Sequence, residues 1–216
     1  MEPLLFFYTR LRSHLMHSPI SEIEFPQNLT TERLTLKRIC HRREEWDEHH
    51  IPTDILRGIQ QSIPELKQRF SWMYPDVPQS YEMSKTYWDM AGLAIQNHSF
   101  HFAVYCGNKF VGFVSLDGRE PALPSFSIGY WCVTPHAGNG YIFEAVSEVI
   151  RFAIEDVKAK RLDITPAVDN APSRAICEKL VQKFNFEYVG VKKNAWRHLV
   201  TNTLCDCAIY VFSQPD

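Results

Sequence analysis

Three strand-like segments follow one another in the middle of this 216-residue chain, and they restrict its fold more than any other feature. They are Phe100–Cys106, Phe110–Leu116 and Phe126–Val133. Apolar and polar residues alternate along them, which is typical of strands with one buried face. Gly107–Asn108 is a two-residue turn signal between the first two segments. The sequence therefore predicts three consecutive antiparallel strands, with residues 117–125 as the loop before the third.

The segments on either side predict a mixed fold. Apolar residues recur at helical spacing from about Tyr141 to Lys158, and again in Ala171–Phe184. Further strands are expected at Arg33–Ile39, Arg161–Thr165, Phe186–Val191 and Cys205–Phe212. This order of elements predicts an α/β fold of the α+β mixed-sheet kind, with helices packed on the faces of the sheet.

The N-terminal part of the chain has a different character. Residues 1–29 form an expected extension, which Pro19 and Pro26 interrupt. Residues 30–216 are expected to form a single domain. Within it, residues 41–97 are mostly helical in character, but four prolines cut them into pieces, of which Ser80–Ile95 is the longest helical candidate.

Composition excludes several classes of protein. The chain carries 23 basic and 25 acidic residues, a net charge of −2, so the basic surface of a nucleic-acid binder is not expected. No apolar run is long enough to span a membrane, and we expect no export signal, because the apolar Leu4–Tyr8 precedes its basic neighbours. We therefore expect a cytoplasmic protein. The six cysteines lack zinc-ligand spacing, so we expect buried thiols and no metal.

A glycine-containing turn joins the third strand to the following helix. It spans Thr134–Tyr141 and includes Gly138, Asn139 and Gly140. Glycines just before a helix let backbone N–H groups point at a ligand, and the helix N-terminus adds a partial positive charge. The turn therefore predicts an anion site suited to phosphate, although it is neither a Walker P-loop nor a Rossmann fingerprint. Glycines with a purely structural role are the alternative interpretation.

A second polar motif opens the next helix. Asn170 is suited to cap that helix, Pro172 fits its first turn, and Ser173 would place a hydroxyl there. Capping alone is the alternative for Asn170, and an ordinary surface position is the alternative for Ser173.

Several segments together resemble the GNAT superfamily of acetyl-CoA-dependent N-acetyltransferases, above all its RimJ/RimL-like branch of ribosomal-protein N-terminal acetyltransferases. The segments are Thr30–Ile39, Phe110–Leu116, Phe126–Val146, Asp169–Leu180, Asn185–Val191 and Cys205–Phe212. The resemblance implies a central, mostly antiparallel and splayed sheet with helices on both faces. It also implies acetyl-CoA as the co-substrate, and residues 41–97 as a helical region on the acceptor side.

The resemblance also assigns roles to individual residues. Strand Ile128–Val133 would pair with the pantetheine arm of acetyl-CoA, and the glycine turn would hold the pyrophosphate. Ser173 would stabilise or protonate the leaving thiolate, with Asn170 near the thioester, and these two are the expected catalytic residues. The expected acetyl-CoA contacts are Trp131, Cys132, Val133, Ala137, Gly138, Asn139, Gly140, Tyr141, Ile142, Asn170 and Ser173.

The chain departs from the family pattern at several positions. Ala137 stands where the family usually has Arg or Gln, and Ile142 stands at a position that is usually small. Residues 183–186 replace the usual Leu-Gly-Phe, and residues 193–198, aligned with the loop before the last strand, contain no carboxylate to act as a base. Candidate proton acceptors are Asp117, Glu120, His136 and His198, each with a plain surface role as the alternative.

Three functions stay open from the sequence. The first is direct acetyl transfer to an amine, which we expect to be a protein N-terminal α-amine, because its pKa of about 7.7–8.0 leaves it partly neutral at pH 7. The second has a small amine, such as a polyamine or an aminoglycoside, as the acceptor. The third is a non-catalytic acyl-CoA-binding domain, which Ala137 favours and the Asn170 and Ser173 pair opposes.

Cys132 and Cys177 raise the alternative of a thiol that carries the acyl group during the reaction, but buried positions in the core explain these two cysteines better. Both monomers and homodimers are compatible with the sequence.

Overall fold

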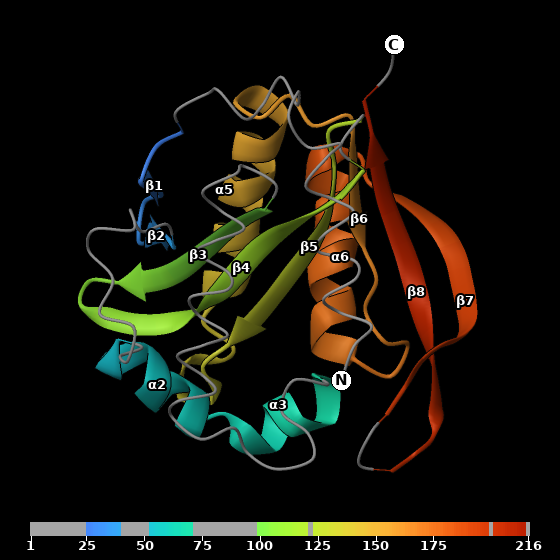
Figure 1. The fold of residues 1–216 in the computed structure, drawn as a ribbon, viewed down its shortest axis with the longest axis horizontal. Coiled ribbons are helices and arrows are strands. Elements are labelled where there is room, and N and C mark those ends of the chain that lie inside the picture. Colours follow the sequence, from blue (N-terminus) through green and yellow to red (C-terminus); the bar gives the residue numbers. More distant parts are fainter. Residues whose placement is uncertain (1–24, 40–51, 71–98, 121–122, 199–200, 215–216) are drawn as a thin grey trace, which may run out of the picture.

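A computed structural model describes residues 25–39, 52–70, 99–120, 123–198 and 201–214 of the chain (Figure 1). The strands are β1 (Asn28–Thr30), β2 (Thr35–Arg38), β3 (Ser99–Cys106), β4 (Lys109–Glu120), β5 (Ser125–Cys132), β6 (Arg161–Ile164), β7 (Glu187–Arg197) and β8 (Leu204–Ser213). The helices are α2 (Thr53–Gln60), α3 (Ile63–Arg69), α5 (Tyr141–Glu155) and α6 (Ala171–Phe184), with a short 3-10 helix η4 (Thr134–His136). The predicted helix at Ser80–Ile95 lies outside the described residues. No helix among the described residues is long and apolar enough to cross a membrane.

The strands form one eight-stranded sheet in the order β1-β2-β3-β4-β5-β6-β8-β7. Neighbouring strands pair antiparallel except β5 and β6, which run parallel. The three predicted consecutive antiparallel strands are confirmed as β3, β4 and β5, and Gly107–Asn108 lies in the turn between the first two. The mixed α/β class expected from the sequence is confirmed as well.

Alternation along β3 divides its side chains between the two faces of the sheet. Phe100 and Phe102 are fully buried in the cluster that includes the apolar side of α5. Ala103 points the other way and packs with Ile55 and Ile59 of α2. Helices therefore cover both faces of the central strands, as the family resemblance implies.

α5 and α6 both follow a strand of the parallel pair, so their N-termini lie at the same end of the sheet (Figure 1). α5 packs against β4 and β5, and α6 packs against β8. Both helices contribute to the same core cluster, α6 through Cys177 and Leu180. The end of α3 reaches the start of α6, where the Arg69 guanidinium lies 2.8 Å from the carboxylate of Asp169.

The ends of several elements differ from the predictions, because backbone geometry and pairing decide them. α5 ends at Glu155 rather than near Lys158, which adopts the left-handed conformation with a φ of +59° and so cannot continue the helix. β4 extends to Glu120 through part of the expected loop 117–125, because it keeps pairing with β5 across a bulge. Residues 193–197, expected in a loop, belong to β7, whose pairing with β8 is interrupted after Lys192 and resumes at Trp196 and Arg197.

The sheet also begins earlier than the sequence suggested. β1 starts at Asn28, within the expected N-terminal extension, and pairs with β2. Phe25 lies ahead of it and is buried, with its ring edge-on to Phe100 and Phe152 at centroid distances of 5.2 and 5.6 Å. The segment just before residue 30 therefore packs into the core, while the division of the chain at that residue stays a prediction.

Candidate functional site

β5 and β6 separate soon after they meet. Ser125, Phe126 and Ser127 pair with Arg161, Leu162 and Asp163, and β6 then ends at Ile164. β5 continues to Cys132 and pairs with β4 along that length. Figure 1 shows the two strands diverging beyond their paired ends. The splayed sheet that the resemblance implies is therefore present, and residues 128–132 of β5 have one edge without a strand partner among the described residues.

The backbone of β5 presents alternate residues to that open edge. The N–H of Val133 donates to the carbonyl of Val111 on β4 at 3.0 Å, so Val133 faces β4. Because successive residues of an antiparallel strand direct their N–H and C=O groups to opposite sides, Trp131 also faces β4, whereas Cys132 and Tyr130 face the open edge. Of the three strand residues expected to contact acetyl-CoA, Cys132 is thus the one whose backbone groups are turned toward the opening.

The turn after β5 has the backbone shape of an anion site. Ala137 follows η4 in an extended conformation, and Gly138 and Gly140 then adopt left-handed conformations with φ of +82° and +77°. Side chains rarely tolerate these angles, which explains the glycines. α5 begins directly after Gly140, so its first N–H groups have no partners within the helix. Residues 137–140 are exposed, and the helix N-terminus adds positive partial charge.

Arg33, in the loop between β1 and β2, lies beside this turn, although no sequence signal placed it there. Its Nη1 donates to the carbonyl oxygen of Asn139 at 3.2 Å, and its Nε donates to the carboxylate of Glu144 at 2.7 Å. Burial raises the pKa of Glu144, but hydrogen bonds from Thr31 and Arg33 together outweigh it and leave the pKa lowered. Arg33 therefore brings a cation to the turn, where Ala137 carries none.

The first two side chains of α5 have different surroundings. Ile142 is buried in the core cluster. Tyr141 is half-buried, and its ring centre lies 5.0 Å from the guanidinium carbon of Arg33. Contact of Ile142 with an anion would therefore come from its backbone N–H group.

Asn170 and Ser173 come together at the start of α6. The Oδ1 of Asn170 accepts a hydrogen bond from the backbone N–H of Ser173 at 3.3 Å, so the predicted capping role is confirmed. The Oγ of Ser173 lies 2.8 Å from the hydroxyl of Tyr130, which β5 supplies from across the opening. Burial raises the pKa of Tyr130 well above its ordinary value, so the phenol keeps its proton.

The thiols near this pair are protonated. Burial raises the pKa of Cys132 and of Cys177 to about 11. Because the thiolate is the nucleophilic form of cysteine, neither side chain is suited to carry an acyl group at neutral pH.

The predicted proton acceptors do not gather in one place. Asp117 lies on β4 with half of its side chain exposed. The side chain of Glu120 is outside the described part of the chain. His136 lies in η4, ahead of the glycines, and His198 lies just beyond β7, where its Nδ1 accepts a hydrogen bond from the N–H of Thr201 at 3.2 Å. Among the described residues, no group of three or more His, Cys, Asp or Glu side chains could hold a metal ion.

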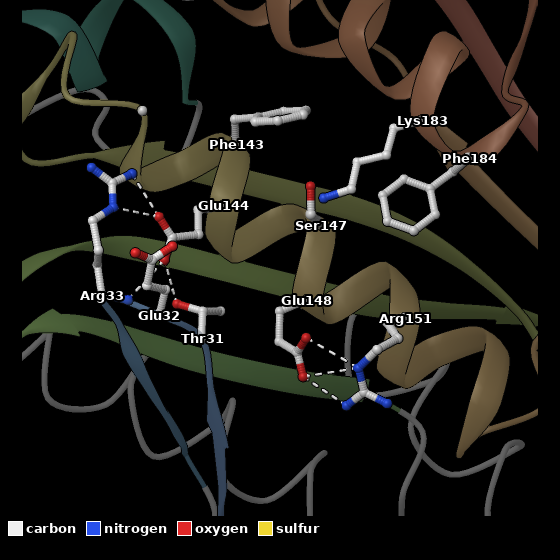
Figure 2. A pocket seen from close by; sticks show the side chains of 11 residues that line it. Thr31, Glu32, Arg33, Phe143, Glu144, Ser147, Glu148, Arg151, Lys183 and Phe184 are labelled. Atoms are coloured by element: carbon white, nitrogen blue, oxygen red, sulfur yellow. Dashed lines mark hydrogen bonds and ion pairs between the residues drawn. The ribbon is translucent and has the colours of Figure 1, made fainter.

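A groove of about 570 Å³ begins at Gly140 and follows the exposed side of α5 toward the end of α6 (Figure 2). At one end lies the ion pair of Arg33 and Glu144, whose atoms approach to 2.6 Å. At the other end lies the pair of Glu148 and Arg151, also at 2.6 Å. The carboxylates of Glu144 and Glu148 are thus each paired with an arginine, while the carboxylate of Glu32 also lines the groove.

The middle of the groove carries positive charge. Lys183 extends from α6 toward Phe143 and Ser147 (Figure 2), and its Nζ lies 5.4 Å from the centre of the Phe143 ring. The Nζ of Lys179 lies 5.5 Å from the same ring. Neither ammonium group has a carboxylate partner among the described residues, and the buried hydroxyl of Ser147 has no hydrogen-bond partner there.

Comparison with known proteins agrees with this geometry. The Escherichia coli ribosomal-protein-serine acetyltransferase is 28% identical over 112 residues, and Bacillus subtilis YdaF, whose name associates it with ribosomal N-acetylation, is 33% identical over 69 residues. These alignments cover 51% and 32% of this chain, and 62% and 38% of the two relatives, so the chain matches less than two thirds of each.

Solved structures share the fold. The ribosomal L7/L12 α-N-protein acetyltransferase RimL in complex with coenzyme A superposes with a TM-score of 0.72 at 21% identity, over 86% of this chain and 96% of that one. The microcin C7 self-immunity acetyltransferase MccE in complex with acetyl-CoA and AMP superposes with a TM-score of 0.70 at 19% identity, over 88% and 98%. The acetyltransferase (GNAT) domain family matches residues 46–180, more than half of the chain. The chain therefore belongs to the GNAT acetyltransferase domain family.

Proposed function

We propose that this chain is an acetyl-CoA-dependent N-acetyltransferase that transfers the acetyl group directly to the α-amine of a protein N-terminus. One observation carries the proposal. The hydroxyl pair of Tyr130 and Ser173 flanks the open stretch of β5, and the same strand leads into the glycine turn at the start of α5. A long ligand with a reactive end and a phosphate-bearing end fits these two features at once.

Acetyl-CoA is a substrate with both kinds of end. Its pantetheine arm carries amide groups, which suit the open backbone groups of Cys132 and Tyr130 in the way that an added strand would. Its pyrophosphate suits the N–H groups of residues 138–141, where the dipole of α5 favours negative charge. Arg33 lies beside the turn, but its guanidinium is paired with Glu144, so the backbone N–H groups carry the contact with the pyrophosphate.

The groove along α5 supports a third contact, with the phosphorylated adenosine end of the same substrate. The ammonium groups of Lys179 and Lys183 both lie near the ring of Phe143 and repel each other. A bound anion would reduce that repulsion. The hydroxyl of Ser147 adds a buried donor without a partner in the described part of the chain. The rings of Phe143 and Phe184 line the same groove and suit a flat base.

The hydroxyl pair matches the chemistry of the leaving group. The amine nitrogen attacks the thioester carbonyl, so a C–N bond forms, the C–S bond breaks, and the sulfur leaves as a thiolate. Ser173 and Tyr130 are placed to donate hydrogen bonds to that thiolate and to supply its proton, and the raised pKa of Tyr130 keeps it a donor. A donor aimed at developing charge is typically worth about 2.7–4 kcal/mol. Direct transfer is favoured because Cys132 and Cys177 are weak nucleophiles.

An N-terminal α-amine suits this site better than a lysine does. Its pKa of about 7.7–8.0 leaves part of it neutral at pH 7, whereas lysine titrates near 10.4. The names of the E. coli relative and of the RimL structure refer to ribosomal-protein acceptors, which supports a protein acceptor here. The described cysteines are all free thiols, and this supports a cytoplasmic location, where thiols stay reduced.

Turnover of acetyl-CoA with a panel of acceptors tests the proposal. The panel contains peptides with a free N-terminal Ser, Ala or Met, the same peptides N-terminally blocked but bearing a lysine, a polyamine and an aminoglycoside. We expect thiol release with the free peptides only. Faster turnover of a small amine would overturn the acceptor class, and binding of acetyl-CoA without turnover of any amine would indicate a non-catalytic domain.

A further inference from the structure

A second polar cluster lies on the α2 side of the sheet. It consists of His101 on β3 with Ser115 and Asp117 on β4, and its face is that of Ala103, which packs with α2. The Oδ2 of Asp117 accepts a hydrogen bond from the hydroxyl of Ser115 at 2.8 Å. The Oδ1 of Asp117 lies 3.6 Å from the Nε2 of His101. Three groups able to hold or pass a proton are thus adjacent.

His101 is the buried member of this cluster. Only 4% of the residue is exposed, and neither ring nitrogen has a hydrogen-bond partner among the described residues. A buried polar group without a partner costs about 1–3 kcal/mol, so an apolar side chain would pack here at lower cost. Burial lowers the pKa of His101, and the charge of Asp117 opposes that shift. The imidazole is therefore neutral at pH 7 and able to accept a proton.

The pairing register places the cluster beside the open stretch of β5. Ser115 pairs with Gly129, and Asp117 pairs with the residue at which β5 leaves β6. A side chain at Gly129 would begin 2.7 Å from the Oγ of Ser115 and 3.7 Å from the Oδ2 of Asp117. The carboxylate therefore lies over the backbone of β5, next to Tyr130, whose own side chain leaves the strand on the α6 face.

The two polar groups thus lie on opposite faces of one strand. Ser173 and Tyr130 lie on the α6 face, where they suit the leaving sulfur, and Asp117 lies on the α2 face with half of its side chain exposed. An amine that approaches from the α2 side would meet the carboxylate first. Acid and base functions on opposite sides of a reacting carbonyl allow both proton movements in one step.

We propose that Asp117, backed by His101, receives the proton of the acceptor amine, an inference that rests on the proposed acetyl transfer. The amine reacts in its neutral form, the fraction that an α-amine offers near pH 7, because only that form has a lone pair to attack with. As the nitrogen attacks and the C–N bond forms, one N–H proton passes to Asp117 and on to the Nε2 of His101. The C–S bond breaks, and the sulfur takes one proton from the Tyr130 and Ser173 pair. Water then removes the proton from His101 and restores the hydroxyl pair.

Asp117 is the catalytic residue in this step, and His101 is a positioning residue that acts through it. Variants Asp117→Asn and His101→Gln test the two roles, with Asp156→Asn as the matched control, because Asp156 is a partly exposed aspartate at the far end of α5. The assay measures kcat with a free-amine peptide, KM for acetyl-CoA, and the dependence of kcat on pH. Acetyl-CoA binding by calorimetry shows that each variant is folded.

We expect Asp117→Asn to lower kcat about 100-fold, the usual contribution of a general base, with KM for acetyl-CoA unchanged. His101→Gln should lower kcat less and remove an ionisation from the acid side of the pH profile, below the ordinary histidine pKa of 6.5. The charged group that faces His101 among the described residues is Asp117, so Asp117→Asn should lower the pKa of His101 further, as measured by NMR.

The outcomes separate this inference from the proposed function. Wild-type kcat in Asp117→Asn, together with a loss of kcat in Ser173→Ala, would overturn the role of Asp117 and leave the transferase intact. An unchanged pH profile in His101→Gln would overturn the role of His101. No turnover of any amine by the unsubstituted protein would overturn both proposals together.

Discussion

Replacing Gly138 with alanine separates the phosphate-binding role of the turn from its role in folding. Gly138 has a φ of +82°, and an added Cβ would meet nothing within 4 Å, so strain in the backbone is the whole direct effect. An L-residue in this conformation costs about 1–2 kcal/mol. The turn can relieve that strain only by rotating its peptide groups, which moves an N–H away from the ligand.

The expected change in affinity follows from one hydrogen bond. A bond from an N–H to a charged phosphate is worth about 1.5–3 kcal/mol, so its loss weakens acetyl-CoA binding roughly 10- to 100-fold. Gly107→Ala is the matched control, because Gly107 has a φ of +57°, equally open surroundings and a place in the β3–β4 turn.

Calorimetric titration with acetyl-CoA and thermal unfolding measure the two effects separately. Both variants should lose about 1–2 kcal/mol of stability, or roughly 2–8 °C in Tm for a chain of this size. Only Gly138→Ala should lose affinity. Equal dissociation constants for the two variants, with equal losses of stability, would refute the assignment of this turn to phosphate.

Three further predictions concern other parts of the site. Tyr130→Phe should lower kcat and leave the affinity for acetyl-CoA unchanged, as steady-state kinetics and calorimetry would show, because it removes a donor to the leaving group and leaves the open backbone of β5 in place. Lys183→Met should weaken binding of CoA more than binding of 3′-dephospho-CoA in parallel titrations, whereas Lys109→Met at the start of β4 should change neither. The lowered pKa of Glu144 means that its ionised form stabilises the fold above its ordinary pKa of 4.5, and that this stability is lost as the pH falls through the lower, folded-state pKa. Urea unfolding of Glu144→Gln should therefore show a weaker dependence on pH below 4.5 than the unsubstituted protein does.

The sequence predicted those parts of the fold that depend on local patterns. α6 begins and ends at the predicted residues, because Asn170 caps it and Asn185 ends it in a left-handed conformation. β5 was predicted to within a residue at each end, since its alternation is regular. β1 was missed because three residues are too few to show a period. Its place in the sheet depends on pairing with β2 and on the burial of Phe25.

The parts of the site that were missed depend on contacts between distant segments. Tyr130 meets Ser173 across 43 positions, and Arg33 meets Asn139 across 106. No local pattern reports such distances. His101 lies in a strand whose alternation predicts only an ordinary buried position. Its proposed role depends on its contact with Asp117 on the neighbouring strand. The alternation of β5 could have predicted the face on which Tyr130 lies, because it places that side chain on the opposite face of the strand from Trp131.

Acetyl transfer itself is the measurement to make first. Purified protein, acetyl-CoA and a peptide with a free N-terminal serine are combined, and thiol release and the mass of the peptide are followed in the same reaction. The proposed function predicts one acetyl group on the α-amine for each thiol released, with a lower rate in Ser173→Ala. An unmodified peptide and no thiol release, at acetyl-CoA concentrations that saturate binding, would contradict the proposed function.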